Sequence, residues 1–309
     1  MSSPLVSVII TSFNHASFIR ESIQSVLDQT HENIEVIIVD DGSSDLSTQK
    51  IAEFKDLRIK TLFFKKNHQA HPRNTAIKMA RGKYIAFQNS DDVWVRSKLE
   101  NQVKKLESDT RIVGCFTGVS IINRWGWTVK KTWATNLFQT QNRSGSKWSN
   151  YFYEKGNCLC ISSAIVKKEV FDKVGLFNTS LLQLSDFDLW IRLVRIGKIF
   201  IIDEPLVKMR VINNANISSP SQKSYNRFVS EYAQILERYI LSKDEKRQIT
   251  VALTSIKLAT PWHRLFADRV LARILSEPDK FEARQKSFSN KLWKMFISNR
   301  ESISIKVTD

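Results

Sequence analysis

The chain has 309 residues, of which 42% are hydrophobic, and a formal net charge of +16. That length allows one large domain or two of ordinary size, with a substantial hydrophobic core. The longest mostly apolar stretch, Ile112–Ile122, is shorter than the roughly 20 residues of a membrane-spanning helix, so we predict no transmembrane segment. The first residues carry neither a basic segment before an apolar run nor a small-residue cleavage site, and we expect a globular protein of the cytoplasm.

The three cysteines and the excess of basic residues narrow the classes of protein further. Cys115, Cys158 and Cys160 are too few for a disulfide framework, and we expect them at buried apolar positions. The positive charge favours a polyanionic partner, which leaves nucleic acid, an anionic membrane surface and a phosphorylated substrate open. Pairs of aspartates at the ends of apolar segments favour the phosphorylated substrate, because paired carboxylates indicate a bound metal ion and catalysis.

Strand and helix patterns alternate through the first third of the chain. Short β-branched runs closed by turn formers predict strands at Val6–Ile10, Ile34–Val39, Leu57–Phe64 and Tyr84–Phe87. Apolar residues at helical spacing predict helices at residues 19–27, from about Ser47, at Arg73–Arg81 and at Ser97–Leu106. This alternation predicts an α/β fold, a mostly parallel Rossmann-like sheet with helices on both faces.

The pattern changes after residue 111. Ile112–Ile122 predicts a strand, and we expect the aromatic-rich residues 123–153 to be a loop. We then predict strands at Cys160–Val166, Ile199–Asp203 and Leu206–Val211, and helices at Lys168–Val174 and Asp186–Ile196. Further on, only helices are predicted, at Tyr225–Ile240, Lys243–Leu258, Trp262–Leu275 and Phe281–Ile297. We therefore divide the chain into an α/β domain of residues 1–220 and an all-helical, basic module of residues 221–309.

Polar side chains follow the first two predicted strands, at the edge of the sheet where such folds bind ligands. Thr11 and Asn14 follow the first strand, and Asp40 and Asp41 follow the second. Carboxylates there can accept hydrogen bonds from a nucleobase or a ribose, although Asp-Asp-Gly-Ser is also a common turn and helix cap. Arg73 opens a later helix and is a candidate for neutralising a diphosphate, with a surface ion pair as the alternative.

Three further aspartates are candidates for metal binding and catalysis. Asp91 and Asp92 follow the fourth strand and offer hard oxygen ligands to Mg²⁺ or Mn²⁺, or else complement the dipole of the next helix. Asp186 opens a helix and is our candidate for the general base that deprotonates an acceptor hydroxyl, or else an N-cap. Near an acceptor we expect Trp148, Asn157 and Trp190, although aromatic residues of this region also suit packing over the sheet.

Five segments of the chain share a recognisable order and spacing. They are VSVIITSFN (Val6–Asn14), IEVIIVDDGSSD (Ile34–Asp45), RNTAIKMARGKYIAFQNSDDVW (Arg73–Trp94), SSAIVKKEVFDKVGLFNTSL (Ser162–Leu181) and SDFDLWIRL (Ser185–Leu193). With them, about residues 4–218 of the chain resemble inverting glycosyltransferase family 2, which has the GT-A fold. The resemblance implies transfer of a sugar from a nucleotide-diphosphate sugar to a hydroxyl of a glycan or lipid-linked glycan, in polysaccharide or glycoconjugate synthesis.

The resemblance also assigns roles to the candidate residues. Thr11, Asp40 and Arg73 would contact uridine diphosphate, and we add Asn14, Asp41 and Asp91 to this nucleotide-sugar pocket. Asp91 and Asp92 would hold the metal ion, Mn²⁺ or Mg²⁺, and Asp186 would be the base of a single in-line displacement that inverts the anomeric configuration.

Four positions depart from the family pattern. Asn89 stands where an acidic residue usually precedes the metal pair, and residues 67–72 lack the customary glycine. Ser185 replaces a common Glu before the base, and Ile212 stands where a His would follow the last strand. These departures leave a catalytically weakened homologue as an alternative.

Basic residues and an apolar patch mark the predicted C-terminal module. Because acceptors of the family are often lipid-linked, we expect Leu292–Ile297 and the surrounding charge to dock on the inner face of the membrane. A helical cap on the catalytic domain or a homo-oligomer contact is the alternative, and nucleic acid is the less favoured partner. A dinucleotide-binding oxidoreductase is a third and less favoured option, since no Gly-x-Gly-x-x-Gly follows the first strand.

Overall fold

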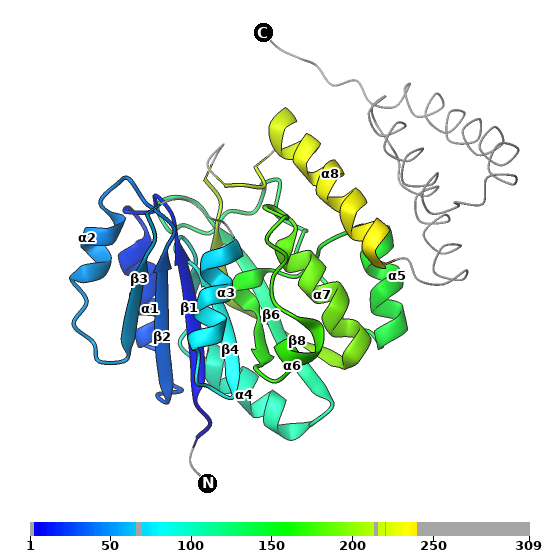
Figure 1. Ribbon diagram of the computed structural model, residues 1–309, viewed down its shortest axis with the longest axis horizontal. Coiled ribbons are helices and arrows are strands. Elements are labelled where there is room, and N and C mark those ends of the chain that lie inside the picture. The colour runs from blue at the N-terminus through cyan, green and yellow to red at the C-terminus, as the bar shows by residue number, and fades with distance from the viewer. Residues whose placement is uncertain (1–2, 66–69, 213–215, 220, 240–309) are drawn as a thin grey trace, which may run out of the picture. The chain divides into compact units, whose positions relative to one another are not determined.

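The computed structural model of the chain describes residues 3–65, 70–212, 216–219 and 221–239 (Figure 1). The chain divides into two compact units, one of residues 1–149 and 157–220 and the other of residues 150–156 and 221–309. The predicted domain boundary after residue 220 stays a prediction, because most of residues 221–309 lie outside the described part. The predicted helices beyond residue 240 lie there as well.

An eight-stranded mixed sheet with the order β3-β2-β1-β4-β7-β6-β8-β5 forms the centre of the first unit. Its strands are β1 (Val6–Ser12), β2 (Ile34–Asp40), β3 (Ile59–Phe63), β4 (Tyr84–Asn89), β5 (Val93–Trp94), β6 (Ile112–Ile122), β7 (Ile165–Lys167) and β8 (Lys198–Arg210). Neighbours among β3, β2, β1 and β4 are parallel, as are β6 and β8, whereas β7 is antiparallel to β4 and β6 and β5 is antiparallel to β8. Since β7 reverses direction between β4 and β6, all strands except β5 and β7 end at the same edge of the sheet.

Helices cover both faces of this sheet. They are α1 (Ile19–Leu27), α2 (Ser47–Ala52), α3 (Ala70–Met79), α4 (Lys98–Ser108), α6 (Val170–Val174) and α7 (Ser185–Ile196). Val6, Val8 and Ile10 of β1 pack in one core cluster with apolar residues of α1 and α4. The helices α3 and α7 lie on the other face (Figure 1). The predicted α/β fold with helices on both faces is confirmed, and burial on both faces explains the continuous apolar runs of β1 and β2.

Three local predictions differ from the structure. The predicted strand Cys160–Val166 begins as a 3₁₀ turn, η1 (Ile161–Ser163), because its serine hydroxyls bond to neighbouring groups instead of extending a ladder. The two strands predicted between residues 199 and 211 form the single strand β8, which absorbs Pro205 at a register shift opposite Gly118. The predicted loop of residues 123–153 contains the start of helix α5 (Gly145–Lys155).

The described part of the second unit is helical. It contains α8 (Gln222–Tyr239), in agreement with the predicted helix at Tyr225–Ile240, and the last residues of α5. The Tyr232 hydroxyl donates a hydrogen bond to the Phe152 carbonyl, and the ring of Tyr232 stacks on Phe228. Within the residues that the structure describes, no helix is both long enough and apolar enough to cross a bilayer.

Candidate active site

The shared carboxyl edge of the strands gathers most of the predicted site residues. The register places Thr11 of β1 beside Asn89 of β4, and Ser12 beside Asp40 of β2. Residues that follow these strands therefore lie around one edge of the sheet, although they are far apart in the chain. Pairing between the strands therefore places these residues at one edge of the sheet, independently of side-chain contacts.

The loops after β1 and β2 are bound to each other. Both carboxylate oxygens of Asp40 accept hydrogen bonds from Ser43, one from its N–H at 2.8 Å and one from its hydroxyl at 2.6 Å. The side-chain oxygen of Asn14 accepts the N–H of Ser44 at 2.8 Å. Asn14 has a φ of 53°, in the left-handed region that Asn tolerates better than most residues. Asp40 and Asn14 therefore build this part of the site, and Asp40 forms the turn that was the alternative prediction.

Arg73 contacts the end of the first strand and the ring of Phe177. Its guanidinium donates a hydrogen bond to the Thr11 hydroxyl at 3.3 Å and lies over the Phe177 ring, 4.9 Å from the centroid. Burial lowers the pKa of Arg73, while the nearby charges of Asp186 and Asp41 raise it. The structure thus brings Thr11, Asp41, Arg73 and Asp186 into one cluster.

Asp186 is a half-buried carboxylate in the first turn of α7. Its Oδ1 accepts the N–H of Phe187 at 2.7 Å, and its Oδ2 accepts the side-chain amide of Asn157 at 3.1 Å. Burial raises the pKa of Asp186 to about 6, although the Phe187 N–H, Arg73 and Asn157 all act to lower it. The residue at the N-cap position is Leu184, so the alternative role of Asp186 as an N-cap does not fit the structure.

Asp91 and Asp92 have different surroundings. Asp92 is fully engaged: its Oδ1 accepts the Arg210 N–H at 2.9 Å, and its Oδ2 accepts the Ser162 hydroxyl and, at 3.4 Å, the Asn89 amide. Asp91 accepts a hydrogen bond of 3.4 Å from Asn216, and its Oδ1 lies 4.0 Å from a ring nitrogen of His15.

Burial raises the pKa of both members of this pair, and the charge of Asp91 raises the pKa of Asp92 further. A bound divalent cation would offset the free energy that burying these two negative charges costs. No group of three or more His, Cys, Asp or Glu side chains suited to a metal ion occurs within the described residues. The donor set nevertheless fits Mg²⁺ or Mn²⁺, because these ions are often held by one or two carboxylates with phosphate oxygens and water as the other ligands. Asp91 is the better candidate ligand of the two.

Arg210, at the end of β8, is buried beside the aspartate pair. Its side chain is 1% exposed, and its Nε donates to the Asp91 carbonyl at 2.8 Å. One Nη donates to the carbonyls of Asn123 and Arg124, and the other to the Glu21 carboxylate at 2.6 Å. Arg210 therefore fixes the backbone that carries the aspartate pair.

Sequence reasoning missed three other polar residues of the site. The Nδ1 of His15 lies 2.7 Å from the Ser90 hydroxyl, Ser162 donates to Asp92, and Asn216 bonds to Asp91. Burial lowers the pKa of His15, whereas Asp92 and Asp45 raise it. The only available signal was their place in loops that follow strands or precede helices. Asn216 also accepts the N–H of Ile212, and so occupies the neighbourhood in which a His was expected.

The three predicted acceptor residues have different positions. Asn157 lies in the site, because it donates to Asp186. Trp148 and Trp190 are 1% and 0% exposed, and Trp190 packs edge-on against Phe116. A buried indole has no face to offer a sugar, so an acceptor contact does not fit these two residues and the alternative of packing does.

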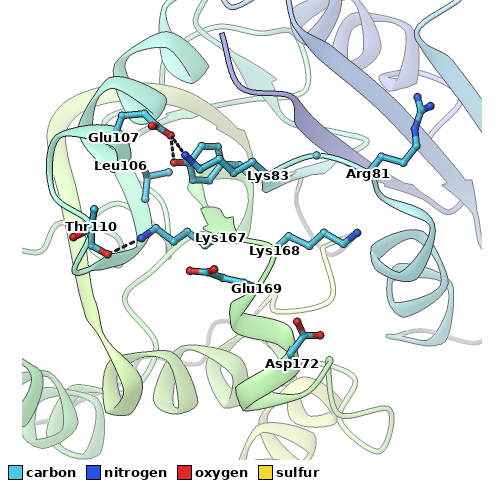
Figure 2. A pocket seen from close by; sticks show the side chains of 11 residues that line it. Arg81, Lys83, Leu106, Glu107, Thr110, Lys167, Lys168, Glu169 and Asp172 are labelled. Atoms are coloured by element: carbon cyan, nitrogen blue, oxygen red, sulfur yellow. Dashed lines mark hydrogen bonds and ion pairs between the residues drawn. The ribbon is translucent and has the colours of Figure 1, made fainter. Parts of the chain in front are cut away.

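A separate hollow of about 780 Å³ lies at the opposite edge of the sheet (Figure 2). Its lysines are engaged with protein atoms: Lys83 with Glu107 at 2.6 Å, Lys167 with the Thr110 carbonyl at 2.6 Å, and Lys168 with the Ala80 carbonyl at 2.5 Å. No predicted site residue lines this hollow. It is therefore distinct from the candidate active site.

Comparison with known proteins identifies the family. The profile of Glycosyl transferase family 2 matches residues 7–175, so the chain belongs to this family. A glycosyltransferase of Rickettsia prowazekii is 32% identical over 210 residues, which cover 68% of this chain and 64% of the relative. The Escherichia coli protein named UDP-Glc:alpha-D-GlcNAc-diphosphoundecaprenol beta-1,3-glucosyltransferase WfgD is 46% identical over 107 residues, 34% of this chain and 42% of that protein. The chain thus matches less than two thirds of the length of either relative.

Solved structures share the fold. The S. aureus protein TarS, residues 1–349 in complex with UDP, superposes with a TM-score of 0.66 at 16% identity, covering 98% of this chain and 94% of that one. The mannosyltransferase PcManGT of Pyrobaculum calidifontis, in complex with GDP-Man and Mn²⁺, gives a TM-score of 0.55 at 19% identity, covering 97% and 88%. At these identities the similarity establishes a GT-A-like fold and nothing about substrates.

Proposed function

We propose that this chain is an inverting glycosyltransferase that transfers a sugar from a UDP-sugar to a hydroxyl of a glycan or lipid-linked glycan, in polysaccharide or glycoconjugate synthesis. One observation carries the proposal: Arg73 donates a hydrogen bond to Thr11 and lies near enough to Asp186 for their charges to interact, so predicted donor-binding groups and the candidate base share one cluster. The complexes with UDP and GDP-Man of proteins with this fold support the donor class. The name of the E. coli relative supports UDP-glucose as a donor and a lipid-linked acceptor.

The proposed reaction is a single displacement at the anomeric carbon. The carboxylate of Asp186 takes the proton of the acceptor hydroxyl as its oxygen attacks the anomeric carbon from the face opposite the diphosphate. The bond from that carbon to the diphosphate oxygen breaks, and the nucleoside diphosphate leaves with the electron pair. Attack from the opposite face inverts the configuration.

The remaining roles follow from charge. Asp91 would hold Mn²⁺ or Mg²⁺, which neutralises negative charge on the leaving diphosphate when bound. Arg73 adds positive charge on the same side, while Asp92 and Arg210 keep the Asp91 backbone in place. Asn89 donates to Asp92, where an acidic residue would add repulsion to an already buried pair.

The proposed setting is the cytoplasm, at the inner face of the membrane, where a lipid-linked acceptor would be reached. The expected docking of residues 292–297 and a homo-oligomer contact of the C-terminal module concern residues outside the described part. They stay predictions.

The test combines thermal unfolding with transfer assays on the full chain. UDP-sugar with Mn²⁺ at about 100 times its dissociation constant should stabilise the protein by about 2.7 kcal/mol, and Asp91→Asn should remove the Mn²⁺-dependent part. Asp186→Asn should retain this stabilisation but lose roughly 10²- to 10⁴-fold in transfer rate. Asp172→Asn, an exposed change at the opposite edge of the sheet, is the matched control. The proposal fails if UDP-, GDP- and dTDP-sugars all leave unfolding unchanged and Asp186→Asn transfers sugar at the original rate.

A further inference from the structure

The turn after β6 carries two tryptophans with their rings in solvent. Trp125 is 74% exposed and Trp127 is 72% exposed, whereas Trp133 nearby packs against the cluster of Ile121 and Ala134. Burial of an indole stabilises a protein by about 25 cal/mol for each Å² of apolar surface removed from water, and an exposed indole does not contribute this free energy. Two exposed indoles within one turn therefore indicate a surface that meets an apolar partner.

Hydrogen bonds hold this turn in one shape. The side-chain oxygen of Asn123 accepts the N–H groups of Trp125 at 2.9 Å and Trp127 at 3.1 Å, and the Asn123 N–H donates to the Trp127 carbonyl at 2.9 Å. Gly126 has a φ of 83°, which favours glycine between the two tryptophans. The two indoles are thus presented by an ordered turn, and their exposure is a property of the fold.

The segment of the chain that contains the turn carries charge of a single sign, and the nearby Glu21 is paired with Arg210 at 2.6 Å. Residues 110–153 contain no Asp or Glu, and their basic residues are Arg111, Arg124, Lys130, Lys131, Arg143 and Lys147. Arg124, Lys130 and Lys131 are exposed, and the Arg124 guanidinium lies 5.1 Å from the centroid of the Trp125 ring. Exposed tryptophans beside basic side chains match the interface of an anionic bilayer, which takes indoles at headgroup depth and attracts lysine and arginine.

The turn is attached directly to the candidate active site. Ile122 at the end of β6 pairs with Arg210 at the end of β8, and the Arg210 guanidinium donates to the carbonyls of Asn123 and Arg124 as well as to that of Asp91. One side chain thus separates the base of the turn from the aspartate pair. A surface that receives Trp125 and Trp127 would therefore lie beside the carboxyl edge of the sheet.

We propose that residues 123–131, here called the tryptophan turn, insert into the headgroup region of an anionic phospholipid bilayer and hold the active site at its surface. This inference deepens the proposed function, because it supplies the means by which a lipid-linked acceptor would reach Asp186. A sugar-stacking platform is the competing role for exposed indoles, and the experiment below separates the two.

The experiment is sedimentation of the full chain with vesicles of phosphatidylcholine containing about one third phosphatidylglycerol. Trp125→Ala/Trp127→Ala should weaken partitioning about tenfold or more, because two interfacial indoles are lost. Lys130→Glu/Lys131→Glu should weaken binding to these vesicles by a similar factor but leave binding to pure phosphatidylcholine unchanged. Leu57→Ala removes an exposed apolar side chain elsewhere and is the matched control. Brominated phospholipid should quench more tryptophan fluorescence in the wild type than in the double tryptophan variant.

Wild-type affinity for vesicles in the double tryptophan variant would overturn the inference. If the same variant also loses binding to a water-soluble oligosaccharide acceptor, the turn is assigned to sugar stacking instead. Thermal unfolding of each variant checks that the fold is intact. The vesicle assay contains no nucleotide sugar, so a negative result there does not contradict the proposed transferase activity. A negative result in the donor-binding test likewise does not contradict the vesicle result.

Discussion

Asp186 and Asn157 form the contact on which the proposed chemistry depends most. Burial raises the pKa of the Asp186 carboxylate to about 6, and the amide of Asn157 favours the ionised form of that carboxylate. A general base works only when it is deprotonated. The rate should therefore be half-maximal near pH 6, reach its full value well above that pH and fall below it.

The acid limb of the pH profile of kcat/KM tests this assignment. In the wild type the limb should fall tenfold per pH unit below an apparent pKa near 6. Asn157→Ala removes a hydrogen bond to the ionised form, so the limb should move to higher pH. Asn136→Ala, a change of the same type at an exposed position, should leave the limb where it was. A limb that stays in place in Asn157→Ala, or a profile without one, would contradict the role of Asp186 as base.

Sequence reasoning recovered part of this residue-scale picture. Thr11, Arg73 and Asp186 were predictable, because each lies at the end of a strand or the start of a helix and in a segment that resembles the family. His15, Ser162 and Asn216 were not, since their place in the site depends on side-chain contacts with residues 70 to 125 positions away. The different surroundings of Asp91 and Asp92 could not be predicted either, because they also depend on contacts with residues far away in the chain.

At the scale of elements, one buried carboxylate joins four segments. Glu35 of β2 accepts the Ser7 hydroxyl of β1 at 2.6 Å, the Arg81 N–H at 2.6 Å and the Arg81 Nε at 3.0 Å, and pairs with Lys60 of β3 at 3.4 Å. Burial acts to raise its pKa, but the hydrogen bonds from Ser7 and Arg81 outweigh it and lower the pKa to about 2. The ionised form therefore stabilises the folded state.

Glu35→Gln should lower the free energy of unfolding by about 2 kcal/mol near neutral pH. Because the pKa is depressed in the folded state, this difference should be complete above the unfolded value of 4.5 and fade as the pH falls toward about 2. Urea unfolding across this range measures it. Glu53→Gln, which removes an exposed pair with Arg20, should cost less than about 1 kcal/mol. An equal loss in both variants, or a pH-independent loss in Glu35→Gln, would contradict the role of Glu35.

The pattern of elements was largely predictable, and the exceptions have physical causes. Strand and helix periods give the order of β1 to β4 and the helices between them, because each buries a regular face. Pro205 and its acidic neighbours indicated a break in the last strand, but β8 continues through them with a register shift opposite Gly118. Gly118 leaves room for this irregularity, because a Cβ at that position would lie 2.7 Å from the Asp203 carbonyl oxygen. The reversed strand β7 has no signal in its three residues, since pairing partners far along the chain decide its direction.

For the whole molecule, charge is the dominant property. The net charge of +16 and the acid-free segment of residues 110–153 produce a positive potential that salt screens. Binding to vesicles with phosphatidylglycerol should therefore weaken at least tenfold between about 0.05 M and about 0.5 M salt. Binding to pure phosphatidylcholine should change little. Sedimentation at several salt concentrations measures both, and equal salt dependence for the two vesicle types would show that charge does not direct the protein to membranes.

The contacts of Arg210 also bear on the order in which the protein folds. This one side chain bonds to Asp91, 119 residues earlier in the chain, and to Glu21, 189 residues earlier. Contacts of such long range close only after most of the chain has been ordered, because each closes a large loop at a cost in entropy. The β1–β4 half of the sheet can therefore form during synthesis, but the aspartate pair reaches its final geometry only after β8 has left the ribosome. A chain that stops before residue 210 would contain every predicted donor-binding residue and still lack the contacts that fix the aspartate pair.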